Sequence, residues 1–251
     1  MESNNTSRVL LGIFDSGVGG FSVAREVRKV SDANIIYYGD CARAPYGNRE
    51  ESEIISFIKD DITFLQDLDV MHFVNACNSM SVLTTNQMLK ECGVKPWRYI
   101  DMIRAFDMHA FFPSDAVVLV IATVATIRSG VYQEVLKKRG LTVFEYAYED
   151  LAQAVESNAS RNNLLSIIRR SIAYAQEIGA THVVYGCTHY PMVHTFFLEV
   201  QESLKWEGNF VDPAVYVAEE IKKWKIGGER KFVPYSSKDT PAFISNVIKF
   251  L

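Results

Sequence analysis

Runs of apolar residues alternate along this chain with segments in which apolar residues recur every three or four positions. The first pattern is typical of buried strands and the second of amphipathic helices. The predicted strands and short apolar runs span residues 9–14, 34–38, 70–76, 116–122, 142–146, 181–186, 209–211 and 231–233. The predicted helices span residues 21–30, 50–68, 79–92, 130–139, 161–178, 191–204, 214–224 and 241–250. This alternation predicts an α/β protein whose parallel sheets carry helices on both faces.

Two cysteines occupy matching positions in this pattern. Cys77 and Cys187 each follow a predicted strand and a small residue, and each precedes two polar residues and a helix-like segment. They lie 110 positions apart (187 − 77), and the same offset places Ser16 on Thr126. The repeat predicts two similar domains, residues 1–96 with 209–251 and residues 97–208. Ligands of parallel sheets bind at the carboxyl ends of the strands, so we expect the active site in the cleft between the domains.

Composition limits the kinds of partner and the cellular compartment that we expect for this protein. The 251 residues carry a formal net charge of −4, without the clustered Lys and Arg that nucleic acid or an anionic membrane would require. No apolar run approaches the roughly 20 residues of a membrane-spanning helix. The polar first seven residues lack the apolar core of a secretion signal, so we expect a cytoplasmic protein. Four cysteines without a CxxC pair indicate neither a disulfide scaffold nor a zinc ribbon.

The paired cysteines favour proton transfer. A thiol at a strand–helix junction readily becomes a thiolate, and two thiols on opposite sides of a substrate can remove a proton and return it from the far side. A metal site built from Cys187 with His182, His189 or His194 is an alternative, although no second cluster with ligand spacing completes it. A hydrolase with Cys187 as nucleophile and His189 as base is another alternative, and it leaves Cys77 unexplained.

Two further loops are candidates for substrate contact. The glycine-rich loop at residues 15–20 matches neither GxGxxG nor GxxxxGK[ST], so we expect no nucleotide, but its N–H groups would suit an anion such as a carboxylate. Asp15 either caps the following helix or acts on an ammonium group or a thiol. In the loop at residues 38–47, Tyr46 and Gly47 either reach a substrate or form a structural turn. Arg43 either neutralises a carboxylate or is solvated.

These motifs together resemble the cofactor-independent glutamate racemases of the aspartate/glutamate racemase superfamily. The resemblance covers nearly the whole chain, and its most specific element is the Cys-Thr-His-Tyr-Pro segment at residues 187–191. Aspartate racemases usually carry Glu where this chain has His189. The matching segments are residues 12–20, 40, 45–47, 76–79, 122–123, 126–132, 186–191, 211–214 and 232–243.

The resemblance implies two flavodoxin-like domains related by pseudo-two-fold symmetry, and interconversion of L- and D-glutamate that supplies D-glutamate for peptidoglycan. It implies no cofactor, no metal ion, no nucleic-acid or membrane partner, and a homodimer. The implied catalytic residues are Cys77, Cys187, Asp15, His189 and Glu156. The implied substrate contacts are Asp15, Ser16, Pro45, Tyr46, Gly47, Asn78, Ser79, Thr123, Thr188 and His189.

The chain departs from the family pattern in two places. Met80 adds bulk at a helix start, and the segment at residues 97–113 is atypical, so we expect it to reshape an interface or a substrate door. The alternatives within enzymes are racemisation of aspartate or hydantoins, and decarboxylation of a malonate. His189 argues against aspartate, and the intact cysteine pair argues against the decarboxylase. A weakly catalytic binding or regulatory protein is the remaining alternative, favoured only by residues 97–113.

Overall fold

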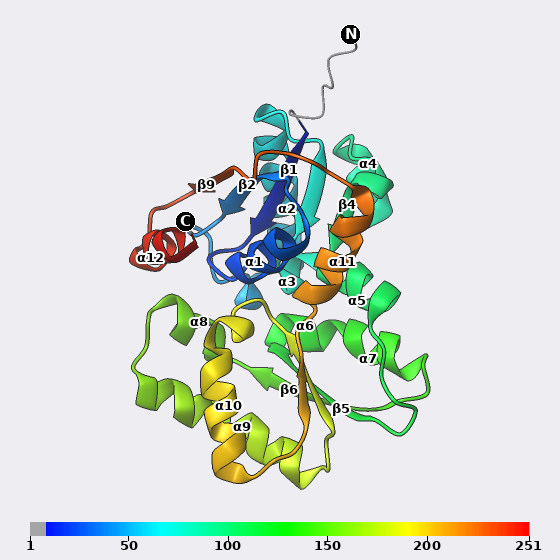
Figure 1. The fold of residues 1–251 in the computed structure, drawn as a ribbon, viewed down its shortest axis with the longest axis vertical. Helices are drawn as coiled ribbons and strands as arrows, with labels where there is room; N and C mark the ends of the chain where they lie inside the picture. The colour runs from blue at the N-terminus through cyan, green and yellow to red at the C-terminus, as the bar shows by residue number, and fades with distance from the viewer. Residues whose placement is uncertain (1–8, 251) are drawn as a thin grey trace.

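The computed structural model describes residues 9–250, which form two parallel β-sheets with helices on both faces of each (Figure 1). This confirms the predicted α/β class. The polar segment at residues 1–7, on which the expectation of no secretion signal depends, lies outside the described residues. Among the residues that are described, no helix is long and apolar enough to cross a membrane.

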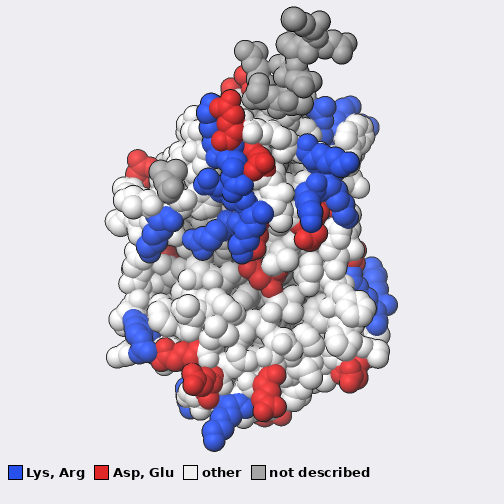
Figure 2. Space-filling model, in the orientation of Figure 1, with Lys and Arg blue, Asp and Glu red and all other residues white. Residues whose placement is uncertain are grey.

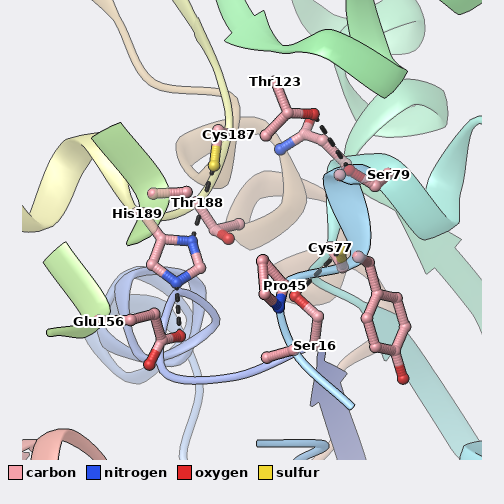
Figure 3. Close-up of a pocket in the computed structure, with 14 residues that line it drawn as sticks. Ser16, Pro45, Cys77, Ser79, Thr123, Glu156, Cys187, Thr188 and His189 are labelled. Carbon is pink, nitrogen blue, oxygen red and sulfur yellow. Dashed lines mark hydrogen bonds and ion pairs between the residues drawn. The ribbon is translucent and has the colours of Figure 1, made fainter. Parts of the chain in front are cut away.

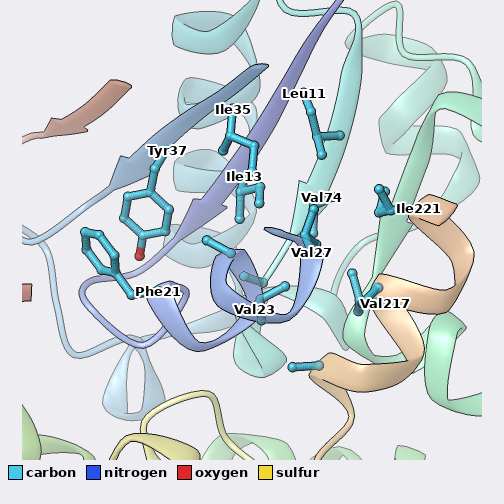
Figure 4. Close-up of a cluster of buried hydrophobic side chains, with 14 of the residues drawn as sticks. Leu11, Ile13, Phe21, Val23, Val27, Ile35, Tyr37, Val74, Val217 and Ile221 are labelled. Atoms are coloured by element: carbon cyan, nitrogen blue, oxygen red, sulfur yellow. The ribbon is translucent and has the colours of Figure 1, made fainter. Parts of the chain in front are cut away.

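The first sheet has the strand order β4-β3-β1-β2-β9, with all neighbours parallel. Its strands are β1 (Leu10–Asp15), β2 (Asn34–Gly39), β3 (His72–Asn75), β4 (Tyr99–Asp101) and β9 (Phe232–Ser236). One face packs against α1 (Phe21–Val30), α11 (Ala214–Trp224) and α12 (Pro241–Phe250), and the other against α2 (Glu51–Asp67) and α4 (Asn86–Glu91). Figure 4 shows how the apolar side chains of β1 and β2 interlock with those of α1 and α11.

The second sheet has the order β6-β5-β7-β8, again all parallel. Its strands are β5 (Val117–Thr123), β6 (Thr142–Tyr148), β7 (His182–Gly186) and β8 (Asn209–Val211). The helices α8 (Leu151–Glu156), α9 (Arg161–Glu177) and α10 (His194–Leu204) pack on one face, while α5 (Met102–His109) and α7 (Val131–Lys137) pack on the other. Two short helices lie at the ends of central strands: α6 (Val124–Ser129) follows β5 directly, and α3 (Asn78–Ser81) follows β3 after Ala76 and Cys77.

The strand register corrects one part of the predicted repeat. Phe14 pairs with Asn75 in the first sheet, as Ile121 pairs with Tyr185 in the second. The counterpart of Ser16 is therefore Thr123, not Thr126. The constant offset fails because the second sheet separates its paired strands by three more residues (185 − 121 against 75 − 14).

Two short strands pair with a sheet that the prediction assigned to the other domain. β4 pairs with β3, and β8 pairs with β7. The chain therefore crosses between the sheets after β4 and again after β8. We keep the division into two domains as a proposal, with each sheet and its helices as one unit.

The structure contains elements that periodicity did not predict. The expected helix at residues 79–92 is two helices, α3 and α4, because the Thr85 side chain accepts the Met88 N–H at 3.1 Å and starts a new helix there. The atypical segment at residues 97–113 contains β4 and α5, and Asp101 caps α5 by accepting the Arg104 N–H at 2.8 Å. The short helices α6 and α8 were also unpredicted.

Charged side chains are unevenly distributed over the molecule. Figure 2 shows Lys and Arg gathered on the half that contains the first sheet, with Asp and Glu interspersed. Lys and Arg side chains of the first half are paired in places, as in Lys29–Glu26 at 2.6 Å and Arg230–Asp32 at 2.9 Å. The face in this view is therefore of mixed charge.

Phe106 of α5 should be essential to the core. Its side chain is fully buried, with ring centroids 5.0 Å from Tyr132 and 5.9 Å from Tyr216. We expect Phe106→Ala to lower the free energy of unfolding by about 3–5 kcal/mol, measured by urea denaturation. Phe111, which is 86% exposed, is the matched control, and Phe111→Ala should change it by less than about 0.5 kcal/mol. Equal effects of the two substitutions would contradict the placement of α5 in the core.

Candidate active site

The carboxyl ends of the central strands of both sheets face one cavity (Figure 3). Parallel strands bring the residues that follow them to the same edge of a sheet, so two opposed sheets gather two such sets. The lining residues are Ser16, Ala44, Pro45, Tyr46, Gly47, Cys77, Asn78, Ser79, Thr123, Ala152, Glu156, Cys187, Thr188 and His189. The structure thus brings together every candidate site residue except Asp15, which is fully buried beside the cavity.

Cys187 begins a chain of polar contacts in the second half. Its Sγ lies 3.6 Å from His189 Nδ1, and His189 Nε2 lies 2.7 Å from Glu156 Oε1. Burial alone would lower the pKa of His189, but the contacts with Cys187 and Glu156 raise it well above its ordinary value. Burial opposes the ionised form of Glu156, yet the hydrogen bond from His189 holds its pKa below the ordinary value. Both pKa shifts favour the charged forms, an imidazolium at His189 and a carboxylate at Glu156, so a buried ion pair lies beside Cys187.

Cys77 has different surroundings in the first half. Its Sγ lies 3.6 Å from Ser16 Oγ, and no cation is within hydrogen-bonding distance of it among the described residues. Burial raises the pKa of this thiol, and the nearby Asp15 carboxyl raises it further. The expectation that the strand–helix junction favours a thiolate is therefore wrong for Cys77, because burial outweighs the effect of the short α3.

Asp15 has a structural role in the glycine-rich loop. Its Oδ2 accepts the N–H groups of Gly20 at 2.9 Å and Gly17 at 3.4 Å, at the start of α1. Burial raises the pKa of this carboxyl. Its Oδ1 has no hydrogen-bond partner among residues 9–250. Asp15 thus holds the loop while one oxygen stays free.

The anion that the glycine-rich loop binds in this structure is a side chain of the protein itself. Glu156 Oε1, from the other half, accepts the Val18 N–H at 3.0 Å. A Cβ on Gly17 would lie 2.2 Å from Glu156 Oε1, and one on Gly19 would lie 2.3 Å from Thr188 Oγ1. These two glycines are needed because the halves approach each other closely at this loop.

Further hydrogen bonds join the halves across the cavity. Ser79 Oγ lies 3.2 Å from Thr123 Oγ1, and Tyr132 donates from its hydroxyl to Asn78 Oδ1 at 2.6 Å. Asn78 Nδ2 has no partner among the described residues. A buried donor without a partner at the cavity wall is suited to an acceptor on a ligand.

The loop at residues 40–47 is fastened to α2. Tyr46 donates its hydroxyl to Asp40, so only the rest of this residue faces the cavity. Arg43 bonds to Asp40, to Asp60 at 2.7 Å and to Asp61 at 3.1 Å. The carboxylates that Arg43 neutralises are thus the protein's own, and Arg43 does not line the cavity.

The histidines of the alternative metal site do not converge. His182 Nδ1 lies 2.9 Å from Thr181 Oγ1, and His194 Nδ1 lies 2.8 Å from the Tyr185 hydroxyl. Of the three histidines considered, only His189 contacts Cys187. Within the described part of the chain, no group of three or more His, Cys, Asp or Glu residues is placed to hold a metal ion.

Sequence reasoning missed several residues around this site. Ala44 and Ala152 line the cavity, but a lone alanine carries no signal in a single sequence. Tyr132 and Asn75 support the site from below through hydrogen bonds. Asn75 was detectable in principle, because it is a polar residue at the end of a predicted buried strand.

The structure thus has two similar parallel-sheet halves, each with one thiol at a shared cavity. Its curated relatives place the chain among amino-acid racemases, which are isomerases. A glutamate racemase from Lactobacillus helveticus is 32% identical over 213 residues, covering 83% of this chain and 78% of the relative. One from Helicobacter acinonychis is 33% identical over 196 residues, covering 75% and 76%. The chain belongs to the glutamate racemase family.

A solved structure shows the same fold. The crystal structure of glutamate racemase from Francisella tularensis, in complex with D-glutamate, matches with a TM-score of 0.81 at 24% identity, covering 97% of this chain and 93% of that one. No protein-family model matches the chain.

The charge state of His189 should depend on Glu156. We expect Glu156→Gln to lower the pKa of His189, because the amide supplies no negative charge to stabilise the imidazolium. An NMR pH titration of the imidazole signals measures this shift directly. Glu177→Gln, at an exposed position of α9, is the control and should leave the titration unchanged. An unchanged His189 titration in Glu156→Gln would contradict the ion pair.

Proposed function

We propose that the protein interconverts L- and D-glutamate by 1,1-proton transfer between Cys77 and Cys187, without a cofactor. The observation that carries this proposal is the pair of thiols from opposite sheets at one cavity, in unlike electrostatic surroundings. General acid–base catalysis at both faces of one carbon requires one group that holds a proton and one that accepts a proton. Family membership supports glutamate as the substrate.

In the proposed reaction, the Cys187 thiolate takes the α-proton of one enantiomer. The C–H bond breaks, its electron pair stays on the α-carbon, and an S–H bond forms at Cys187. Cys77 then gives its thiol proton to the opposite face of the carbanion and becomes a thiolate. After the transfer, Cys187 is a thiol and Cys77 is a thiolate, which are the states required to act on the other enantiomer. Each cysteine is therefore the base in one direction of the reaction.

We propose that the remaining candidate residues stabilise the carbanion and the thiols. The α-proton of an amino acid is weakly acidic, so preorganised donors around the substrate carboxylate have to offset the developing charge. Ser16, Ser79 and Thr188 supply hydroxyls, and the unpaired Asn78 Nδ2 fits a carboxylate oxygen. Pro45, Tyr46, Gly47 and Thr123 complete the wall of the cavity.

Each thiol has a neighbouring group that can assist it in this proposal. Asp15, whose charge affects Cys77, assists the first thiol, and His189, held by Glu156, assists the second. Glu156 thus acts through His189, as a positioning residue.

The alternative of a binding or regulatory protein loses its main support. That reading depended on residues 97–113, but α5 packs into the core and no residue of this segment lines the cavity. Racemisation of aspartate uses the same chemistry and differs only in the length of the side chain. The substrate assay described below separates the two amino acids.

We also propose that the protein works in the cytoplasm as a homodimer and supplies D-glutamate for peptidoglycan, with a small molecule as its only partner. Family membership supports the metabolic role. Exposed apolar side chains on α12, Ile244 at 49% and Ile248 at 70%, support self-association. Light scattering coupled to size-exclusion chromatography would test it, and a monomeric mass at micromolar concentration would contradict the dimer.

Each thiol should be indispensable for racemisation. We expect Cys77→Ala and Cys187→Ala each to lower the rate by at least about 100-fold, since each removes a general acid–base group. The measurement is loss of the α-proton NMR signal of L-glutamate in D2O with no cofactor added, together with a chiral assay for D-glutamate. Cys92→Ala, at a half-buried cysteine outside the cavity, should retain full activity.

The same assay decides between the substrates. Loss of the α-proton signal with aspartate but not with glutamate would change the substrate and keep the mechanism. Full racemase activity in either cysteine variant would rule out the two-thiol mechanism.

A further inference from the structure

A buried polar network lies directly beneath Cys77. Asn75, the last residue of β3, is fully buried, and its Oδ1 accepts the Cys77 N–H at 3.1 Å. Its Nδ2 donates to the Tyr99 hydroxyl at 3.0 Å and to Thr84 Oγ1 at 3.3 Å. Both ends of the amide are therefore satisfied, as a buried polar side chain requires. The network joins β3, β4 and the turn after α3 at the point where Cys77 leaves the sheet.

The network fixes the backbone of Cys77 from the strand side. On the helix side, the Cys77 carbonyl accepts the Ser81 N–H at 2.9 Å and the Ser81 hydroxyl at 2.7 Å. α3 has only four residues, and a helix of one turn has little stability of its own. The hydrogen bond to Asn75 thus fixes the backbone of Cys77, which the four-residue α3 alone would hold weakly.

Among residues 9–250, the second half has no equivalent of this network at its cysteine. The register makes Tyr185 the counterpart of Asn75, and the Tyr185 hydroxyl contacts His194 at 2.8 Å instead. Cys187 is held through its sulfur, by His189 at 3.6 Å. Both cysteines have a sulfur contact at 3.6 Å and a carbonyl that accepts a main-chain N–H, and among the described residues they differ in that the Cys77 N–H also bonds to a side-chain amide.

We infer that Asn75 is a positioning residue for Cys77, with Tyr99 and Thr84 as its supports. By fixing the N–H of Cys77, the amide directs Sγ toward Ser16 and the cavity. The inference deepens the proposed function, on which the assignment of Cys77 as an acid–base group rests. It also gives a role to β4, which lies in the segment that departs from the family pattern.

Asn75→Leu keeps the approximate size of the side chain and removes all three hydrogen bonds. We expect kcat for racemisation to fall on the order of tenfold, because a small misplacement of a reacting group is costly. The step that involves Cys77 should slow selectively. With α-deuterated substrates, the kinetic isotope effect should therefore rise for the enantiomer that Cys77 deprotonates and fall toward unity for the other.

A second readout does not depend on racemisation. Cys77 and Cys187 are labelled with iodoacetamide across a range of pH, and each labelled peptide is quantified by mass spectrometry. Release of the buried Cys77 main chain should raise the labelling rate of Cys77 relative to Cys187 at least threefold in Asn75→Leu. Tyr99→Phe, which keeps the bond between Asn75 and Cys77, should change both readouts in the same direction by less.

Tyr185→Phe is the matched control at the equivalent strand position, and it should leave both readouts as in the wild type. If Asn75→Leu and Tyr99→Phe leave the isotope effects and relative labelling unchanged, the positioning role is wrong, whatever the loss of rate. Should Asn75→Leu fail to fold, Tyr99→Phe alone decides. Absence of racemisation in the wild type, with the expected change in labelling, would overturn the proposed function and keep Asn75 as the residue that positions Cys77.

Discussion

The site depends on one side chain, Glu156, whose carboxylate contacts residues of both halves of the molecule. Its Oε1 accepts a hydrogen bond from the Val18 N–H of the first half and contacts His189 of the second. The same oxygen therefore joins the halves and stabilises the imidazolium beside Cys187. Because a buried cation without a counter-charge is costly, the charged state of His189 depends on Glu156, which lies in the same half. The Val18 N–H of the first half thus holds the same carboxylate oxygen that pairs with His189 in the second half.

The two halves are similar in fold and unlike in charge, and the proposed chemistry requires that difference. The register makes Ala122 the counterpart of Asp15, so only the first half places a carboxyl beneath its cysteine. Only the second half places an imidazolium beside its cysteine. A symmetric site would hold both thiols in the same protonation state, whereas transfer across a carbon needs one of each. The asymmetry arises at the carboxyl ends of the strands, since Asp15 is the last residue of β1 and His189 follows β7.

The sequence predicted most of this architecture because apolar periodicity reports burial directly. It failed at β4 and α5, because a strand of three residues and a helix of eight are too short to show a clear period. The sequence predicted that the site residues lie together, because parallel strands place their carboxyl ends at one edge of a sheet. The partners of Glu156 and the direction of the Tyr46 hydroxyl did not follow, because they depend on how the two halves approach each other. A glycine-rich loop likewise indicates an anion without indicating that the anion is a side chain of the same protein.

The departures from the family pattern lie behind the site. Met80 is fully buried in the cluster that packs against α2, and it does not line the cavity. Its carbonyl accepts the Thr84 hydroxyl at 2.9 Å, and Thr84 in turn contacts Asn75. Met80, through Thr84, and Tyr99 of β4 thus both reach the amide of Asn75, a buried polar group that is tolerated because each of its groups has a partner. Neither Met80 nor any residue of the segment at residues 97–113 lines the cavity, so both departures lie outside the residues of the proposed chemistry.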